Sequence, residues 1–123
     1  MILGIGTDMV DTRRISRLYA RFGERLTEKL LSEAERAALR PGDTARQLAK
    51  RFAAKEATLK ALGTGLAQGW RWHDMEISHD TAGKPLLLCP KAGQGVRFHL
   101  SLTDEPPYAL AFVVMEQAHE ATR

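Results

Sequence analysis

Three ionisable residues from two separate parts of the chain have the types and spacing that metal and phosphate chemistry needs. In a segment expected to be helical, Glu56 lies four residues after Phe52 and three before Leu59, so it shares their apolar stripe. A carboxylate on that stripe is costly to bury unless a positive group meets it, and Lys60 lies one helical turn further on. Asp8, near the start of the chain, is the candidate for a second acid.

The pair formed by Asp8 and Glu56 suits one kind of metal. Two carboxylates are few for a calcium site built by protein alone, whereas Mg²⁺ keeps several waters and takes further oxygens from a substrate's phosphates. Each residue also has an ordinary interpretation: Glu56 and Lys60 can form a helix-surface ion pair, and Asp8 can be a turn or N-cap aspartate. The metal interpretation therefore requires the two acids to meet in the fold, which spacing alone does not establish.

The first half of the chain is expected to hold one strand and then helices. The apolar run from Ile2 to Ile5 is typical of a buried strand that ends at Gly6, so Asp8 is expected to emerge at the end of that strand. After this strand, the sequence contains residues that typically begin and end helices. The predicted helices are residues 13–22 after Asp11-Thr12, a short helix opened by Ser32 to Glu35 and closed by Pro41-Gly42, and residues 45–62 between Asp43-Thr44 and Gly63-Thr64-Gly65.

The second half of the chain changes to alternating and apolar runs separated by turns, a pattern typical of strands. The predicted strands are residues 75–78, 86–89, 98–102 and 108–115. Helices followed by a strand meander predict an α+β fold, with a mostly antiparallel sheet packed against the helices. The length of 123 residues suits one compact domain, which we expect to span residues 1–123.

Composition narrows the class of protein. Apolar residues make up 44%, enough for a core, and no apolar run is long enough to span a bilayer. The N-terminal residues lack the pattern of a signal peptide. Cys89 is the only cysteine, so we expect neither a disulfide within the chain nor a thiolate zinc site. We expect its side chain to be buried and to pack in the core. These features predict a cytoplasmic protein without a membrane partner.

Positive charge is concentrated in the first half of the chain. Residues 1–60 hold 13 Lys and Arg against 8 Asp and Glu, whereas residues 61–123 hold 5 against 7. This asymmetry favours an acidic partner or a phosphorylated ligand.

An arginine ridge runs along the first predicted helix. Arg14, Arg17 and Arg21 are spaced i, i+3 and i+7, and Arg25 would extend the ridge if the helix continued. The ridge can be a solvated face, a nucleic-acid site or a docking surface for an acidic protein. Aromatic residues are only 7% of the chain and no Gly-rich RNA motif accompanies the ridge, which does not favour nucleic acid.

Four motifs in order carry a resemblance to a known family. They are Gly4 to Val10, Arg51 to Ala61 running into Gly63-Thr64-Gly65, Gly83-Lys84-Pro85, and His99 to Asp104. The chain resembles the bacterial holo-acyl-carrier-protein synthases, the short-chain class of phosphopantetheinyl transferases, from Ile2 to about Glu116. The second motif is highly specific.

The resemblance implies an activity, a metal and an assembly. The activity is transfer of the 4'-phosphopantetheine arm of coenzyme A to a serine of apo acyl carrier protein, which leaves adenosine 3',5'-bisphosphate. It implies that Asp8 and Glu56 bind Mg²⁺, that the arginine ridge docks the acidic carrier, and that a homotrimer shares each active site between two subunits. The residues that it implies for coenzyme A are Arg51, Lys60, Gly63, Gly65, Gly83, Lys84, Pro85 and Thr103.

The proton acceptor in such a reaction stays open at this point. Glu56 is the first choice, directly or through a water, and Asp104 is the second; Lys60 would act as a cation near the leaving oxygen. His99 shares a strand face with Ser101, which favours a structural role. Two rival functions also stay open: a non-catalytic basic module for nucleic acid or an acidic protein, and a different Mg²⁺ enzyme acting on nucleotides or sugar phosphates.

Overall fold

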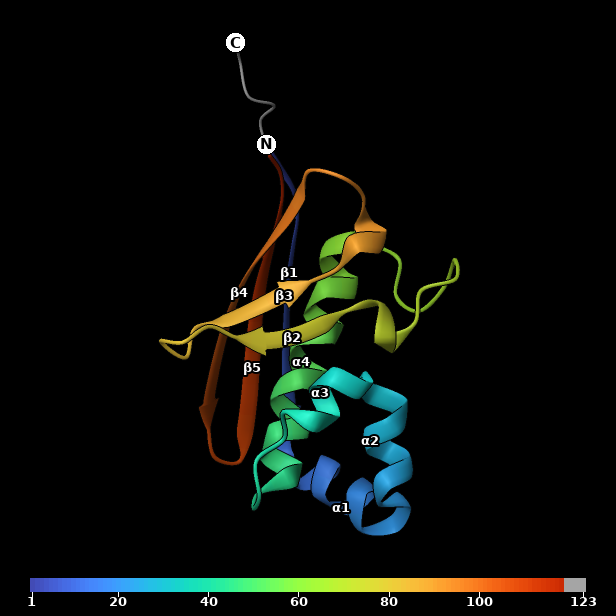
Figure 1. Cartoon of the computed structure of the whole chain (residues 1–123), viewed down its shortest axis with the longest axis vertical. Helices are drawn as coiled ribbons and strands as arrows, with labels where there is room; N and C mark the ends of the chain where they lie inside the picture. Colours follow the sequence, from blue (N-terminus) through green and yellow to red (C-terminus); the bar gives the residue numbers. More distant parts are fainter. Residues whose placement is uncertain (119–123) are drawn as a thin grey trace.

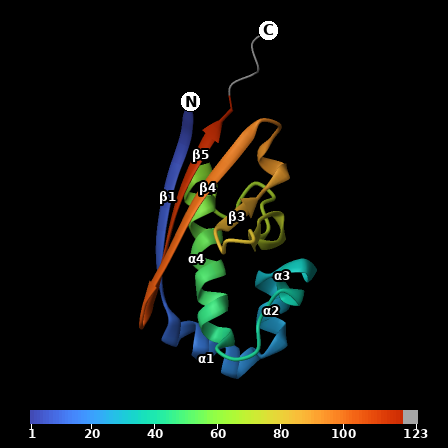
Figure 2. The same cartoon turned by 60° about the vertical axis from the view of Figure 1, so that its left-hand side comes forward.

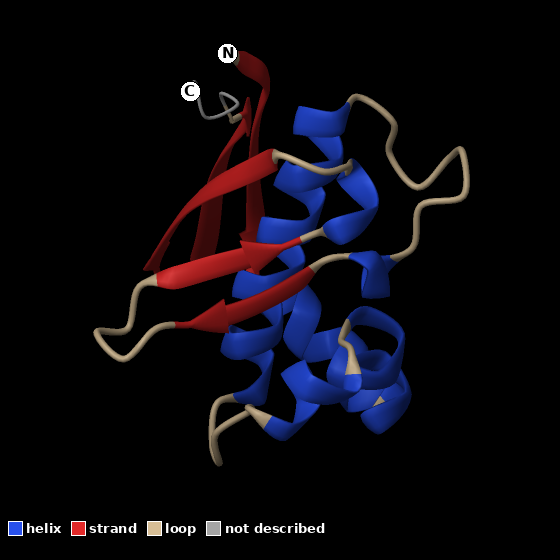
Figure 3. Cartoon of the chain, turned by 45° about the horizontal axis from the view of Figure 1, so that its top comes forward, coloured by secondary structure: helices blue, strands red, loops and turns tan. Residues whose placement is uncertain are grey.

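A long helix, α4, runs along one face of the main sheet in the computed structural model, which describes residues 1–118 (Figures 1 and 2). The hairpin of β2 and β3 crosses α4 beside β4 (Figure 3). The end of the predicted domain, residues 119–123, lies outside the described residues. The elements in chain order are β1 (Ile2–Asp11), α1 (Thr12–Phe22), α2 (Glu24–Leu30), α3 (Glu33–Ala37), α4 (Thr44–Leu62), η1 (Trp72–Asp74), β2 (Glu76–His79), β3 (Pro85–Leu88), η2 (Pro90–Ala92), β4 (Val96–Glu105) and β5 (Tyr108–Gln117).

The main sheet is antiparallel throughout and has the order β1-β5-β4, so β1 and β4 are its two edges. Strands β2 and β3 pair with each other in a separate antiparallel hairpin. This arrangement confirms the predicted α+β fold with an antiparallel sheet packed against helices. All four strands predicted in the second half are present, and β4 and β5 are longer than predicted.

Strand β1 does not end at Gly6, contrary to the sequence prediction. Gly4 and Gly6 instead lie inside the strand, where its backbone touches that of α4. A Cβ atom on Gly6 would lie 1.8 Å from the carbonyl oxygen of Ala57, and one on Gly4 would lie 2.0 Å from that of Ala61. The two glycines therefore permit close packing rather than a turn. Asp8 is the next residue on the same side of β1, because side chains alternate along a strand.

The predicted N-caps are confirmed, but α3 already ends at Ala37 rather than at Pro41-Gly42, and one helix is missing from the prediction. The side chains of Asp11, Ser32 and Asp43 accept hydrogen bonds from backbone N–H groups at the starts of α1, α3 and α4. Gly63 ends α4 in the left-handed conformation. Helix α2 was not predicted: Gly23, with a φ of 56°, ends α1, and a new short helix begins at the following residue.

The core lies between α4, the inner face of the main sheet and α1. Its buried members include Val10, Ile15, Leu48, Ala111 and Val113, and Leu18, Phe52 and Leu102 pack against them. Cys89 is buried, as predicted, beside Leu59 and Met75. Among residues 1–118, no helix combines the length and the hydropathy needed to cross a bilayer.

Candidate active site

Asp8 and Lys60 form an ion pair where the edge strand β1 packs on α4, and Glu56 lies one helical turn before Lys60. Nζ of Lys60 donates to Oδ1 of Asp8 at 3.2 Å and to the carbonyl oxygen of Thr7 at 3.0 Å. The hydrogen-bonded partner of Lys60 is thus Asp8, whereas the helical spacing had pointed to Glu56. The ion pair joins the last turn of α4 to β1, and the lysine side chain is about half exposed to solvent.

The carboxylates of Asp8 and Glu56 lie close enough to affect each other electrostatically. Burial raises the pKa of Glu56 above its usual range, and the negative charge of Asp8 raises it further. The positive charges of Lys60 and Arg14 act in the opposite direction. The fold therefore places the two acids that the sequence pattern singled out within electrostatic influence of each other, and a lysine and an arginine also act on Glu56.

The donor set of this acid pair fits Mg²⁺ better than a metal that needs a full protein cage. Among residues 1–118, no group of three or more His, Cys, Asp or Glu side chains is arranged to hold a metal ion. Asp8 and Glu56 offer hard carboxylate oxygens whose like charges favour a cation between them. An ion held by two carboxylates keeps positions for water and for phosphate oxygens of a substrate.

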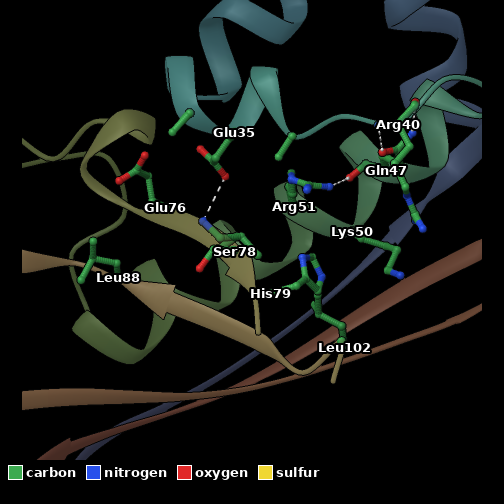
Figure 4. Close-up of a pocket in the computed structure, with 14 residues that line it drawn as sticks. Glu35, Arg40, Gln47, Lys50, Arg51, Glu76, Ser78, His79, Leu88 and Leu102 are labelled. Atoms are coloured by element: carbon green, nitrogen blue, oxygen red, sulfur yellow. Dashed lines mark hydrogen bonds between the residues drawn. The ribbon is translucent and has the colours of Figure 1, made fainter. Parts of the chain in front are cut away.

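A basic cavity of about 760 Å³ lies against another side of α4 (Figure 4). Its lining includes Arg40, Lys50, Arg51 and His79. The side chain of Arg51 is only 7% exposed, and its Nε has no hydrogen-bond partner among the described residues. Burial lowers the pKa of Arg51 below its usual range. A buried donor without a partner beside a basic cavity is typical of a site for an anion.

The residues predicted to bind coenzyme A fall into two groups. Gly83 lines the cavity together with Arg51, and Lys84 and Pro85 follow it at the start of β3. Thr103 is exposed on the outward face of β4, whereas its neighbour Leu102 lines the cavity. Within one chain, Thr103 is therefore on the opposite face of the sheet from the cavity.

The second group belongs to the end of α4 that carries the acid pair. Gly63 and Gly65 both have positive φ, of 79° and 59°, in the turn that follows Lys60. The acid pair lies at the β1 edge of the main sheet, and the cavity lies toward the β4 edge and the hairpin. The two groups therefore lie on different sides of α4, and we call each a candidate half-site.

The alternative proton acceptors lie away from Glu56 within the chain. Asp104 forms an ion pair with Arg46, whose hydrogen bond lowers the pKa of that carboxyl. Arg46 precedes Glu56 by ten residues of helix, roughly 15 Å. His99 is exposed on the outward face of β4 and pairs with Glu116, at 2.8 Å between His99 Nε2 and Glu116 Oε1. The shared face of His99 and Ser101 agrees with the sequence prediction, but the ring is on the surface.

The arginine ridge is exposed on α1, and its first member reaches the acid pair. Arg14, Arg17 and Arg21 are all exposed, and no described acidic residue forms an ion pair with them. The guanidinium of Arg14 lies 6.0 Å from the ring centroid of Phe52, on the same helix as Glu56. Arg25 is exposed too, but it belongs to α2, so the helix does not continue as the extended ridge would require.

Comparisons with known proteins identify the family. A model of the 4'-phosphopantetheinyl transferase superfamily matches residues 4–113. The chain belongs to this superfamily. It is 50% identical to the holo-[acyl-carrier-protein] synthase of Acidithiobacillus ferrooxidans over 95% of this chain and 98% of that one. The resemblance drawn from the four sequence motifs is confirmed.

Solved structures of this class have the same fold. The holo-[acyl-carrier-protein] synthase of Neisseria meningitidis superposes with a TM-score of 0.85 at 41% identity, covering 94% of this chain and 99% of that chain. A holo-(acyl-carrier-protein) synthase from Bacillus anthracis, in complex with CoA (3',5'-ADP), superposes with a TM-score of 0.83 at 35% identity, covering 96% and 99%. The predicted fold of a phosphopantetheinyl transferase is thus confirmed.

Sequence reasoning missed one buried ion pair in this phosphopantetheinyl transferase. Lys55 and Glu35 have side chains that are 0% and 1% exposed, and Lys55 Nζ lies 2.6 Å from Glu35 Oε1. Removing one partner of such a pair typically costs about 3–5 kcal/mol, because the other charge stays buried. The signal was present: Lys55 is seven residues after Leu48 and four before Leu59, within the apolar stripe. Glu35 had been assigned only to a capping box.

Proposed function

We propose that this chain transfers the 4'-phosphopantetheine moiety of coenzyme A to a serine of an acidic apo acyl carrier protein, releasing adenosine 3',5'-bisphosphate, with Mg²⁺ as the metal. One observation supports the proposal most: Asp8, which pairs with Lys60, acts electrostatically on Glu56 although it is distant in the sequence, in a chain of the phosphopantetheinyl transferase superfamily. A cytoplasmic location, where both substrates would be met, is part of the proposal.

In the reaction, the serine hydroxyl attacks the β-phosphorus of coenzyme A, and the bond to the bridging oxygen of the leaving nucleotide breaks. Asp8 and Glu56 would hold a Mg²⁺ ion, which supplies positive charge against the pyrophosphate. Lys60 is held by Thr7 and Asp8 with its ammonium at the same spot. Its charge stabilises the negative charge that develops on the leaving oxygen.

Glu56 is the proton acceptor that the geometry favours. Its carboxylate lies one helical turn before Lys60, beside the place where the serine and the pyrophosphate would meet. Asp104 is held by Arg46, and its pKa is lowered, so it is the weaker base. A carboxylate has two oxygens, so Glu56 can ligate with one and accept the serine proton with the other.

The carrier protein would dock on α1. The exposed charges of Arg14, Arg17 and Arg21 suit an acidic surface, and Arg25 adds a further charge from α2. Charge complementarity of this kind speeds encounter and fixes register more than it raises affinity. Because Arg14 influences Glu56 electrostatically, a carrier bound to α1 would have its serine close to the acid pair.

Coenzyme A would lie between the two half-sites of neighbouring subunits. The basic cavity, with the unpartnered Nε of Arg51, suits the phosphates of the adenosine half. The acid pair suits the pyrophosphate at which transfer occurs. Since the two half-sites lie on different sides of α4, a homotrimer can complete each site from two chains.

The outward face of the main sheet supports such an assembly. Ile5 and Met9 of β1 are 60% and 62% exposed, and Tyr108 and Phe112 of β5 are each 43% exposed. Thr7 pairs with Phe112 and Met9 with Leu110, so these side chains form one continuous face. Contiguous exposed apolar surface of this kind typically marks a protein interface.

Mass measurement of the carrier protein tests the proposed activity. The purified chain is incubated with coenzyme A, Mg²⁺ and an apo carrier protein, and the carrier is weighed before and after. We expect a gain equal to one phosphopantetheine group, lost when a chelator removes the metal. An unmodified carrier, in the presence of a fully folded protein, would show that the activity is wrongly assigned.

A further inference from the structure

The carboxylate of Glu35 joins two walls of the basic cavity. Oε1 accepts a hydrogen bond from Lys55 Nζ on α4 at 2.6 Å, and Oε2 accepts one from the backbone N–H of Ile77 on β2 at 3.1 Å. Oε1 also accepts a hydrogen bond from the backbone N–H of Ser32, at 3.0 Å, at the start of α3. A single buried side chain thus links α3, α4 and β2.

Lys55 completes this connection with its two remaining donors. Nζ donates to the carbonyl oxygen of Leu30 at 2.6 Å, at the end of α2, and to that of Trp72 at 3.1 Å, in η1. A lysine ammonium has three donors, so every one is used. Lys55 is also one helical turn after Arg51, on the same side of α4.

The linked elements are those that enclose the cavity. Glu35 and Ile77 themselves line it, as do Ser78 and His79 on β2 and Arg51 on α4. Figure 4 shows the bond from Glu35 to the backbone of β2, with the side chain of Arg51 nearby. The two oxygens of one carboxylate therefore set the separation between the α4 wall and the β2 wall.

We infer that Glu35 is a positioning residue for coenzyme A: its carboxylate fixes the β2 wall relative to Arg51, and so sets the width of the cavity. The inference rests on the proposed function. A helix cap needs only the bond to Ser32, and stability alone can be supplied by well-packed apolar side chains. The second oxygen satisfies the buried backbone N–H of Ile77, and the same bond ties the β2 wall to α3 and α4.

The variant Glu35→Gln tests the inference with little change of size. An amide has one carbonyl oxygen and one NH₂ group, so it cannot accept from both Lys55 and Ile77. We expect the KM for coenzyme A to rise by about 10- to 100-fold, as misplaced supporting groups typically cause, with little change in kcat at saturating coenzyme A. The KM for the carrier protein should stay unchanged. Titration calorimetry with adenosine 3',5'-bisphosphate should show a matching loss of affinity.

Two further variants separate positioning from folding. Glu33→Gln removes an exposed carboxylate from the same helix and should leave every constant unchanged. The double variant Glu35→Leu with Lys55→Met leaves no buried charge unpaired, so it should fold even if Glu35→Gln does not. We expect it to show the same raised KM for coenzyme A.

The outcomes distinguish this inference from the proposed function. If the double variant folds and binds coenzyme A as tightly as the wild type, Glu35 is only structural and the inference is overturned, while the proposed function stands. If the wild type neither binds coenzyme A nor modifies the carrier, the proposed function fails and the inference fails with it.

Discussion

Replacing Gly6 by alanine should disrupt the acid pair without touching either acid. The new Cβ would lie 1.8 Å from the carbonyl oxygen of Ala57 and 2.8 Å from its carbonyl carbon. Ordinary contact begins at 3.4 Å, so β1 and α4 would have to separate by more than an ångström. The obstacle is backbone and cannot rotate away. Because Asp8 is on β1 and Glu56 on α4, the same movement would pull the two carboxylates apart.

The expected cost of Gly6→Ala appears in both stability and activity. Overpacking of this kind destabilises by about 1–3 kcal/mol, and a rigid backbone obstacle favours the upper end of that range. A misplacement of about 1 Å at a reacting site can lower the rate by about 10²-fold, equivalent to about 2.7 kcal/mol. Urea unfolding measures the first quantity, and kcat/KM for carrier modification measures the second. The Mg²⁺ concentration needed for half-maximal activity should rise.

A second glycine provides the control for Gly6→Ala. At Gly93 an added Cβ would meet only Val96 Cγ2, at 3.8 Å, although its φ of 119° also disfavours alanine. Gly93→Ala should therefore lower stability while leaving the Mg²⁺ requirement unchanged. A folded Gly6→Ala protein with wild-type activity and a wild-type Mg²⁺ requirement would refute the view that the contact between β1 and α4 sets the distance between Asp8 and Glu56.

Three further predictions concern the acid pair, the docking helix and the assembly. Glu56→Gln should abolish Mg²⁺-dependent transfer and stabilise the metal-free protein at neutral pH. Since the raised pKa of Glu56 penalises its charged form, urea titrations should show this gain shrinking as the pH falls through that raised pKa toward the usual glutamate value, below which none of it remains; an equal gain at every pH would contradict the burial argument. Arg14→Ala should raise the KM for the carrier protein about tenfold or less in kinetic assays and leave the affinity for coenzyme A unchanged. An equal loss of coenzyme A affinity would contradict the assignment of α1 as the docking helix. Phe112→Asp should convert a trimer to inactive monomers in sedimentation, and an active monomer would refute the shared site.

The sequence predicted the fold class and the functional helix, because their signals are local. Apolar spacing and caps located α4, and alternation located the strands of the second half. The strand β1 was cut short because glycine usually interrupts strands, and nothing local shows that Gly6 faces the backbone of another element. Helix α2 was missed for a related reason, since Gly23 ends one helix and a new one starts at once.

The sequence predicted the metal site only on the condition that Asp8 and Glu56 lie close together, because their contact depends on long-range packing. In the structure, the alternation of β1 turns Gly4, Gly6 and Asp8 toward α4, and Asp8 lies near enough to Glu56 to act on it electrostatically. The pair of Lys55 and Glu35 was missed because their contact, like that of the two acids, depends on long-range packing. Its partner is 20 residues away, on a helix whose position the sequence did not give.

Neighbouring residues of α4 have different partners because each step along a helix turns the side chain by about 100°. Lys55 points to Glu35 and closes the cavity wall, whereas Lys60 points to β1 and Asp8. Arg51 and Glu56 are separated by about 140° around the axis, so one helix carries the proposed anion site on one side and the proposed metal site on another. A single chain can therefore carry both proposed groups of site residues but cannot bring them together in one site. That geometry, more than the small size of the domain, is the physical reason to expect that neighbouring copies complete each site.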